Sequence, residues 1–331
     1  MATYKGIQGY TVQKLSSDPT ASEAAGQLWY NSTAGAFKLA VEGAGSWASG
    51  GAMNTGRAAM GGCGTQTAGL AFGGTPNQTA TETYDGTSWS TSPATLILGR
   101  SAFGGAGTAT AAIAFGGAIP PTSSGGLKAE TEKYDGSSWS EVADLASGRM
   151  SNRGVGISTA ALSIGGYNPN TTALALVESY DGSTWTAKTA MNTAKAKGAA
   201  TTQGTTTAAL YFSGVTPASD ASALTESWNG TSWSVENELN TGRNDGGGSG
   251  IQTAAVCFCG DLAPGITVKT ETFNGTTWTE VGNMAIAGYS ITGFGTSSLS
   301  LAAAGAPTPT RATATEEWTD PVYTIKTVTV S

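Results

Sequence analysis

Short runs in which large apolar residues alternate with small ones recur along most of the chain. In each run, two large apolar side chains are two positions apart, which places both on one face of a β-strand. These pairs are Leu70/Phe72, Ile113/Phe115, Leu162/Ile164, Leu210/Phe212 and Val256/Phe258. A strand rich in glycine and alanine precedes each pair, and glycine suits places where backbones approach closely. We therefore expect glycine-rich inner strands, with the apolar face of the second strand packing against a neighbouring sheet.

A second pattern follows each apolar run, in which Asp-Gly or Asn-Gly lies between two β-prone segments. These dipeptides favour tight hairpins because both turn residues adopt positive φ angles. Complete copies run from Thr81 to Trp89, Thr131 to Trp139, Val177 to Trp185, Thr225 to Trp233 and Thr270 to Trp278, and a shortened copy starts at Thr315. The pattern thus predicts repeated units of four strands each.

The register of the repeat is set by a basic residue and by a glycine pair that ends the second strand. The first residue of the pair follows the basic residue by 16 positions in the copies that start at Arg57, Arg100, Arg149 and Arg243. The same offset separates Lys197 from Ser213, and Gly288 from Ala304 in the degenerate sixth copy. Periods of roughly 40–50 residues are typical of propellers.

The order of these features resembles the kelch repeat: a basic residue, an apolar strand ending in two glycines, a variable loop, and Glu-x-Tyr-Asp-Gly-x-x-Trp. The resemblance covers roughly residues 46–320 and implies an all-β fold, a six-bladed kelch-like β-propeller. Asn229 and Asn274 replace the aspartate, and Ser213 and Cys259 replace the first glycine of the pair. These departures affect single blades and leave the predicted architecture unchanged.

Six tryptophans occupy the start of the fourth strand, at positions 47, 89, 139, 185, 233 and 278. The first has no Tyr-Asp-Gly segment before it, and the sixth copy has no tryptophan after it. Because these deficits complement each other, we expect a closing strand near residues 46–50 to complete the last blade. Such closure would leave no long sheet edge exposed.

The repeat predicts three regions, which are an attachment or oligomerisation segment at 1–43, the propeller at 44–321 and a C-terminal strand at 322–331. Within the first region, residues 26–39 predict a β-hairpin that resembles hairpins of phage tail-fibre and other virion proteins. The strands from Gly62 to Gly74 resemble those of kelch-type proteins of marine bacteriophages. The C-terminal strand needs a partner, which residues 10–12 or the hairpin could supply within the subunit or across an oligomer interface.

Composition narrows the range of partners. A net charge of −7 and a pI near 4.7 argue against nucleic acid, because phosphate binding requires clustered Lys and Arg. No apolar stretch reaches the roughly 18 residues of a membrane helix, and no export signal precedes the first repeat. We therefore expect a soluble protein without membrane insertion.

The candidate chemistry is sparse. The chain has no histidine, the commonest general base and a common metal ligand, and its 3 cysteines fit small buried side chains better than metal ligands. One repeat position holds a glutamate in every copy, namely Glu82, Glu132, Glu178, Glu226, Glu271 and Glu316. We expect these carboxylates to hold the blades together by pairing with the repeated arginines. No catalytic residue, cofactor or metal is predicted.

The loops after the glycine pairs differ in length and sequence, and variable loops on a rigid scaffold are where binding usually occurs. In an up-and-down blade, these loops share a face with the connections between blades. The candidate binding residues on this face are Asn77, Gln78, Tyr167, Asn168, Asp220, Asp261 and Arg311. Tyr167 is the strongest candidate, because an aromatic ring can stack on a sugar or anchor a protein.

These features predict a non-enzymatic phage virion protein, in a tail fibre or on the particle surface, that presents a propeller to a host-surface glycan or protein. Residues 1–43 would contact other virion proteins or form a homo-oligomer, and the chain would be made in the host cytoplasm. One alternative is a purely structural capsid or tail protein. Another is a carbohydrate-active enzyme, although the segment from Ser179 to Trp185 lacks one residue of the sialidase Asp-box that it resembles.

Overall fold

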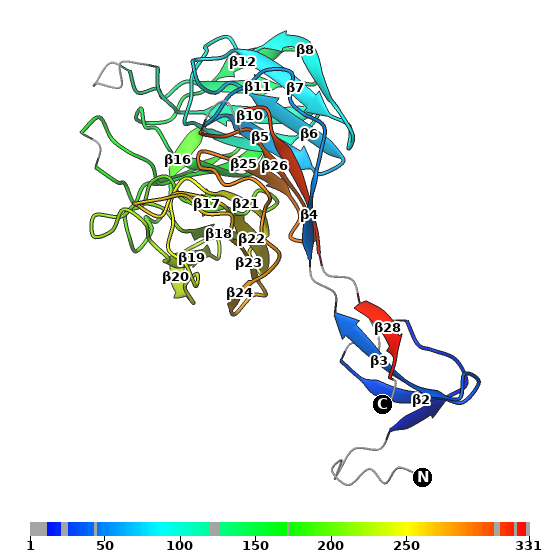
Figure 1. The fold of residues 1–331 in the computed structure, drawn as a ribbon. Coiled ribbons are helices and arrows are strands. Elements are labelled where there is room, and N and C mark those ends of the chain that lie inside the picture. Colours follow the sequence, from blue (N-terminus) through cyan, green and yellow to red (C-terminus); the bar gives the residue numbers. More distant parts are fainter. Residues whose placement is uncertain are drawn as a thin grey trace. The chain divides into compact units, whose positions relative to one another are not determined.

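The computed structural model describes residues 12–20, 26–42, 45–119, 126–170, 172–307, 312–320 and 323–328. The fold is all-β: within these ranges every regular element is a β-strand, and the strands form seven four-stranded sheets (Figure 1). The chain divides into a larger unit, residues 46–319, and a smaller unit that joins residues 1–45 to residues 320–331. None of the described residues belongs to a helix that could cross a membrane.

Six antiparallel sheets lie in the larger unit. Sheet 1 contains β5 (Gly61–Thr65), β6 (Ala68–Phe72), β7 (Ala80–Tyr84) and β8 (Trp89–Thr95). Sheet 2 contains β9 (Gly104–Thr108), β10 (Ala111–Phe115), β11 (Thr131–Tyr134) and β12 (Trp139–Val142). Sheet 3 contains β13 (Arg153–Ile157), β14 (Ala160–Ile164), β15 (Val177–Tyr180) and β16 (Trp185–Ala187).

The remaining three sheets of this unit follow the same order. Sheet 4 contains β17 (Ala199–Ala200), β18 (Ala209–Phe212), β19 (Thr225–Trp228) and β20 (Trp233–Glu236). Sheet 5 contains β21 (Gly247–Ile251), β22 (Ala254–Phe258), β23 (Thr270–Phe273) and β24 (Trp278–Glu280). Sheet 6 contains β25 (Thr292–Gly295), β26 (Leu299–Ala303), β27 (Thr315–Thr319) and, from the other end of the chain, β4 (Ser46–Ser49).

The first strands of these six sheets form a closed cycle. Each contacts the first strand of the next sheet, from β5 through β9, β13, β17 and β21 to β25, and β25 contacts β5 again. Glycine permits this approach: a Cβ on Gly154 would lie 2.3 Å from the Gly105 carbonyl oxygen. A hydrogen bond from the Gly305 amide to the Arg57 carbonyl, 3.0 Å long, links sheet 6 back to sheet 1.

Strand β4 lies in the region where the sequence predicts a closing strand. It pairs antiparallel with β27, and Trp47 stands opposite Trp318. The Trp47 Nε1 also donates a hydrogen bond of 2.9 Å to the Thr270 hydroxyl of sheet 5. The N-terminal strand therefore contributes both to the edge of sheet 6 and to its packing against sheet 5.

The apolar core lies between consecutive sheets. The Trp139 ring packs against Phe72 of sheet 1 with ring centroids 4.9 Å apart, and its Nε1 donates to the Thr81 hydroxyl at 3.0 Å. Equivalent hydrogen bonds join Trp89 to Thr315, Trp185 to Thr131 and Trp278 to Thr225. Each repeated tryptophan in these pairs thus joins its own sheet to the preceding one.

Among the described residues, five of the six repeated glutamates form buried ion pairs, four of them with the repeated arginines, as the sequence predicts, and one with a lysine. The pairs are Arg57–Glu82, Arg100–Glu132, Arg149–Glu178, Lys195–Glu226 and Arg243–Glu271. The Glu82 carboxylate also accepts the backbone amides of Asn54 and Thr55, at 2.8 and 3.1 Å. Buried charges are tolerated only when they are paired and hydrogen-bonded, and these contacts fix the connection that leads into each sheet.

The register of the fourth repeat differs from the sequence prediction. Lys195, and not Lys197, forms the ion pair with Glu226, at 3.1 Å. The Gly166 amide donates to the Lys195 carbonyl, just as the Gly74 amide donates to that of Arg100. Lys195 precedes Ser213 by 18 positions, so the first hairpin of sheet 4 contains two additional residues. Lys197 consequently occupies a different place in the fold.

The smaller unit contains the seventh sheet, here called the terminal sheet. Its strands are β1 (Gln13–Leu15), β2 (Leu28–Asn31), β3 (Ala36–Glu42) and β28 (Tyr323–Thr327), in that order. β1 pairs parallel to β2, whereas β28 pairs antiparallel to β3, so the C-terminal strand finds its partner in the same chain. Residues 10 and 11, the other expected partner, lie outside the described residues.

Candidate functional site

Six residues with left-handed backbone frame one end of the axis around which the first strands are arranged. They are Ala59, Ala102, Ser151, Lys197, Asp245 and Ser290, here called the mouth ring, with φ between 49° and 57°. Backbone hydrogen bonds connect neighbours, for example from the Ser151 amide to the Ala102 carbonyl at 2.6 Å. The Asp245 amide donates to the Lys197 carbonyl at 2.7 Å. The ring therefore fixes six side chains from six sheets around one opening.

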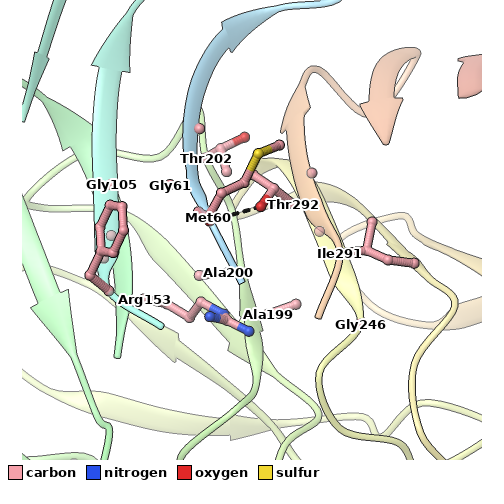
Figure 2. A pocket seen from close by; sticks show the side chains of 17 residues that line it. Met60, Gly61, Gly105, Arg153, Ala199, Ala200, Thr202, Gly246, Ile291 and Thr292 are labelled. Carbon is pink, nitrogen blue, oxygen red and sulfur yellow. Dashed lines mark hydrogen bonds between the residues drawn. The ribbon is translucent and has the colours of Figure 1, made fainter. Parts of the chain in front are cut away.

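All six mouth-ring residues line a single hollow of about 240 Å³, here called the outer cavity. An inner cavity of about 50 Å³ lies among the first strands and shares Met60, Arg153, Ile291 and Thr292 with the outer cavity. Most of its lining is glycine or alanine, and Arg153 is the one charged side chain that lines it within the described part of the chain (Figure 2). The two cavities together follow the axis of the cycle.

Charged residues interrupt the repeat at three neighbouring points of this opening. Four mouth-ring positions hold alanine or serine, whereas the other two hold Lys197 and Asp245. Two positions further along each repeat, Arg153 stands where the other copies have Gly61, Gly104, Ala199, Gly247 and Thr292. The three charged residues come from sheets 3, 4 and 5 and therefore lie side by side around the axis.

The geometry couples these three side chains. The Lys197 Nζ lies 3.0 Å from the Asp245 Oδ2, and the Arg153 Nη2 lies 3.9 Å from the Asp245 Oδ1. The Arg153 Nε donates to the Gly198 carbonyl, which orients the guanidinium. Figure 2 shows the Arg153 side chain extending into the space between the first strands.

Electrostatics favour the charged form of Lys197. Burial lowers the pKa of Lys197, but the charge of Asp245 and its hydrogen bond outweigh that effect, so the pKa is raised above its usual value. The outer cavity thus carries two cations and one carboxylate, in a chain whose net charge is −7. Cations exceed carboxylates by one in this lining, and Asp261 adds a negative charge near Lys197 from outside it.

The extra residues of sheet 4 cross the axis at the opposite end. The Gln203 Nε2 donates a hydrogen bond of 2.8 Å to the Gly64 carbonyl of sheet 1, which is not a neighbour of sheet 4 in the cycle. The Gln203 amide donates to the Gly250 carbonyl of sheet 5 at 2.9 Å. The insertion therefore braces three sheets at the end of the axis opposite the outer cavity.

The structure brings two of the residues predicted from the sequence close to this opening. Tyr167 and Asp220 line a further hollow of about 450 Å³ together with Lys197 and Met150. Tyr167 is only 9% exposed, and burial raises the pKa of its phenol. Its ring packs against Ala173 of its own loop and Ala196 of the connection into sheet 4, instead of standing free as a stacking platform.

The other predicted residues mainly shape their loops. The Asn168 side-chain oxygen accepts the amides of Asn170 and Thr172, at 3.0 and 2.9 Å. Asn77 has a left-handed backbone, and the Gln78 amide donates to the Gly74 carbonyl. The Asp261 carboxylate accepts the Ala263 amide at 2.8 Å. Arg311 lies outside the described residues.

Sequence reasoning missed Arg153, Lys197 and Asp245 as site residues. Arg153 is an arginine outside the repeated basic position, and the offset of 16 places Lys197 at the position that Lys195 occupies in the structure. Counting from Lys195 would place Lys197 and Asp245 in line with four alanines or serines, but the offset of 16 puts Lys197 at the basic position instead. No group of three or more Cys, Asp or Glu in the described ranges is arranged to hold a metal ion.

Comparisons with known proteins bear on the fold. No known protein family matches the sequence, and no curated protein matches it. One solved structure, titled "Structure of YjhT", aligns with a TM-score of 0.65 at 13% sequence identity, covering 83% of this chain and 99% of that one. At this identity the likeness shows the fold alone, and the seven four-stranded sheets are consistent with a fold of the β-propeller type.

Proposed function

We propose that residues 46–319 form a six-bladed kelch-like propeller that acts as a non-enzymatic binding module in a bacteriophage virion, within a tail fibre or on the particle surface. Sheets 1 to 6 share one repeat and form a closed cycle, which supports six blades. The terminal sheet belongs to a separate unit. In this proposal it attaches the propeller to other virion proteins or to further copies of the chain.

The binding role is supported by a contrast between the scaffold contacts, which repeat from sheet to sheet, and the charged residues at the outer cavity, which do not. The buried ion pairs and the tryptophan hydrogen bonds recur from sheet to sheet. Arg153, Lys197 and Asp245 do not recur, and they gather at the outer cavity on the face that bears the variable loops. Structural constraints on the scaffold do not require charged residues there, because the other copies have alanine or serine at the mouth-ring positions and glycine, alanine or threonine at the Arg153 position.

The virion assignment rests on the resemblance of residues 26–39 to tail-fibre hairpins and of the repeats to phage kelch-type proteins. In the structure, this segment contributes β2 and β3 of the terminal sheet. Mass spectrometry of purified phage particles tests the assignment. We expect peptides of this chain at stoichiometric levels, and their absence from intact particles would refute it.

An adsorption experiment tests the binding role. Residues 217–220 form an exposed turn at the 450 Å³ hollow, and we would replace them with Gly-Ser-Gly-Ser in assembled particles. The control replaces the exposed Ser137 and Ser138, in the turn between β11 and β12, with glycine. We expect only the first variant to adsorb more slowly to host cells. Equal adsorption by both variants would favour the spacer role of a purely structural protein.

A further inference from the structure

The outer cavity is lined by charged side chains and by hydroxyl groups, and these favour some classes of ligand over others. Beside Arg153, Lys197 and Asp245, the lining contains the hydroxyl groups of Thr75, Ser101, Ser151, Ser290 and Thr292. Apolar contact comes from Met60, Met150 and Ile291. A volume of about 240 Å³ far exceeds the ~10–15 Å³ that one water molecule requires. The cavity therefore has room for a small organic molecule.

Arg153 has a guanidinium nitrogen that is available to donate hydrogen bonds to a ligand. Its Nε and Nη2 are engaged by the Gly198 carbonyl and the Asp245 carboxylate, while its Nη1 takes part in no hydrogen bond among the described residues. The Arg153 side chain is 23% exposed, so solvent or a ligand reaches it. Its Nη1 group can therefore donate its two N–H groups to a ligand carboxylate, and the hydrogen bond to Gly198 holds the guanidinium in place for that contact.

Lys197 supplies a second cation on the neighbouring sheet. Its ammonium has three donors, of which the contact with Asp245 at 3.0 Å uses one, and its side chain is 38% exposed. Asp245 remains in the same lining and leaves one net positive charge. A monoanion matches that charge, whereas a dianion would meet repulsion from the Asp245 carboxylate.

We propose that the outer cavity binds a sugar acid, a small ligand with one carboxylate and several hydroxyl groups. Arg153 and Lys197 hold the carboxylate, Asp245 accepts a ligand hydroxyl, and the serine and threonine hydroxyls contact the remaining ring substituents. This inference deepens the proposed function and rests on it, because it names the chemistry that the binding face would recognise on a host surface.

Isothermal titration calorimetry on the full chain tests the proposal with four probes: glucuronate, galacturonate, glucose and inorganic phosphate. We expect at least one uronate to bind at least tenfold more tightly than glucose and phosphate, with an affinity that falls as salt is added. The proposal is overturned if neither uronate binds, if glucose binds equally well, or if phosphate binds more tightly.

Matched variants locate the site. We expect Arg153→Met and Lys197→Met each to weaken uronate binding at least tenfold, and Lys188→Met, at an exposed lysine after β16 that does not line the cavity, to leave it unchanged. If Arg153→Met does not fold, as judged by circular dichroism, Lys197→Met decides alone because its side chain is more exposed. Unchanged affinity in Lys197→Met overturns the assignment.

Binding by the isolated chain does not depend on virion incorporation, so a chain that binds uronate but is absent from particles fails only the virion proposal.

Discussion

Replacing Trp139 by alanine tests the packing between consecutive sheets. The side chain is 7% exposed, and its ring lies between Phe72 of sheet 1 and Tyr134 of its own sheet, with centroid distances of 4.9 and 5.2 Å. Its Nε1 donates to the buried Thr81 hydroxyl. The substitution therefore removes a large buried ring, two aromatic contacts and one hydrogen bond between sheets.

Removal of a large core aromatic costs about 3–5 kcal/mol, because a cavity remains where the ring was. Trp139→Phe keeps most of the ring and loses the hydrogen bond to Thr81, which is worth about 1 kcal/mol. We therefore expect alanine to cost at least twice as much as phenylalanine. Val235→Ala, at an outer-strand position that is 63% exposed, should change the free energy of unfolding by less than about 0.5 kcal/mol.

Urea unfolding at constant temperature, followed by tryptophan fluorescence and circular dichroism, measures these differences. The slope of the free energy against urea must be the same in all variants for the comparison to hold. A loss below about 1 kcal/mol for Trp139→Ala would refute the packing argument. Equal losses for the alanine and phenylalanine variants would show that the hydrogen bond, and not the ring, holds the two sheets together.

Three further predictions concern closure, backbone strain and acid stability. Deleting residues 1–50 removes β4 and exposes the edge of β27, so the thermal midpoint should fall, and an unchanged midpoint would show that β4 is dispensable. Ser213→Gly should raise the free energy of unfolding by about 1 kcal/mol, because Ser213 has φ 62° and a buried hydroxyl without a partner among the described residues; a lower urea midpoint would contradict this. The amides of Ser137 and Ser138 lower the pKa of Asp135 to about 2. The ionised Asp135 carboxylate therefore stabilises the folded protein above its ordinary pKa of 3.8, and this contribution is lost as the pH falls toward 2. Asp135→Asn should make unfolding between pH 4 and pH 2 less dependent on pH, and an unaltered acid profile would count against this role.

Local periodicity explains why much of the scaffold can be predicted from the sequence. Strand faces follow from pairs such as Leu70/Phe72, because they depend on residues close together in the chain. A hairpin forms at Asp85-Gly86 as expected, but only Gly86 has a positive φ, and the Asp85 carboxylate instead accepts the amides of the two residues after Gly86. The pairing of Arg57 with Glu82 could be expected because both recur with the repeat. Trp47 has no Tyr-Asp-Gly segment before it and the last copy has no tryptophan after it, which predicts that a strand near Trp47 completes the last copy. Strand β4 pairs with β27 at that place.

The site depends on contacts that no local pattern encodes. Lys195 and Lys197 are two residues apart, and the offset of 16 favours Lys197; only the contact with Glu226 shows that Lys195 fills the repeated position. The Asn168 side chain turns back onto its own loop because the backbone amides there need acceptors, whereas the Tyr167 ring is buried by apolar packing against Ala173 and Ala196.

The sequence by itself determined the strands, the turns and the repeated pairs, since a period of 42 to 50 residues between successive fourth-strand tryptophans sets the same local interactions again in each copy. Only the tertiary structure decided that Arg153, Lys197 and Asp245 meet at one opening. They belong to three different repeats, at or just before the first strand of each, and their proximity arises because the first strands converge on a common axis when the cycle closes. Convergence of this kind depends on how all the sheets pack together, which no single repeat specifies.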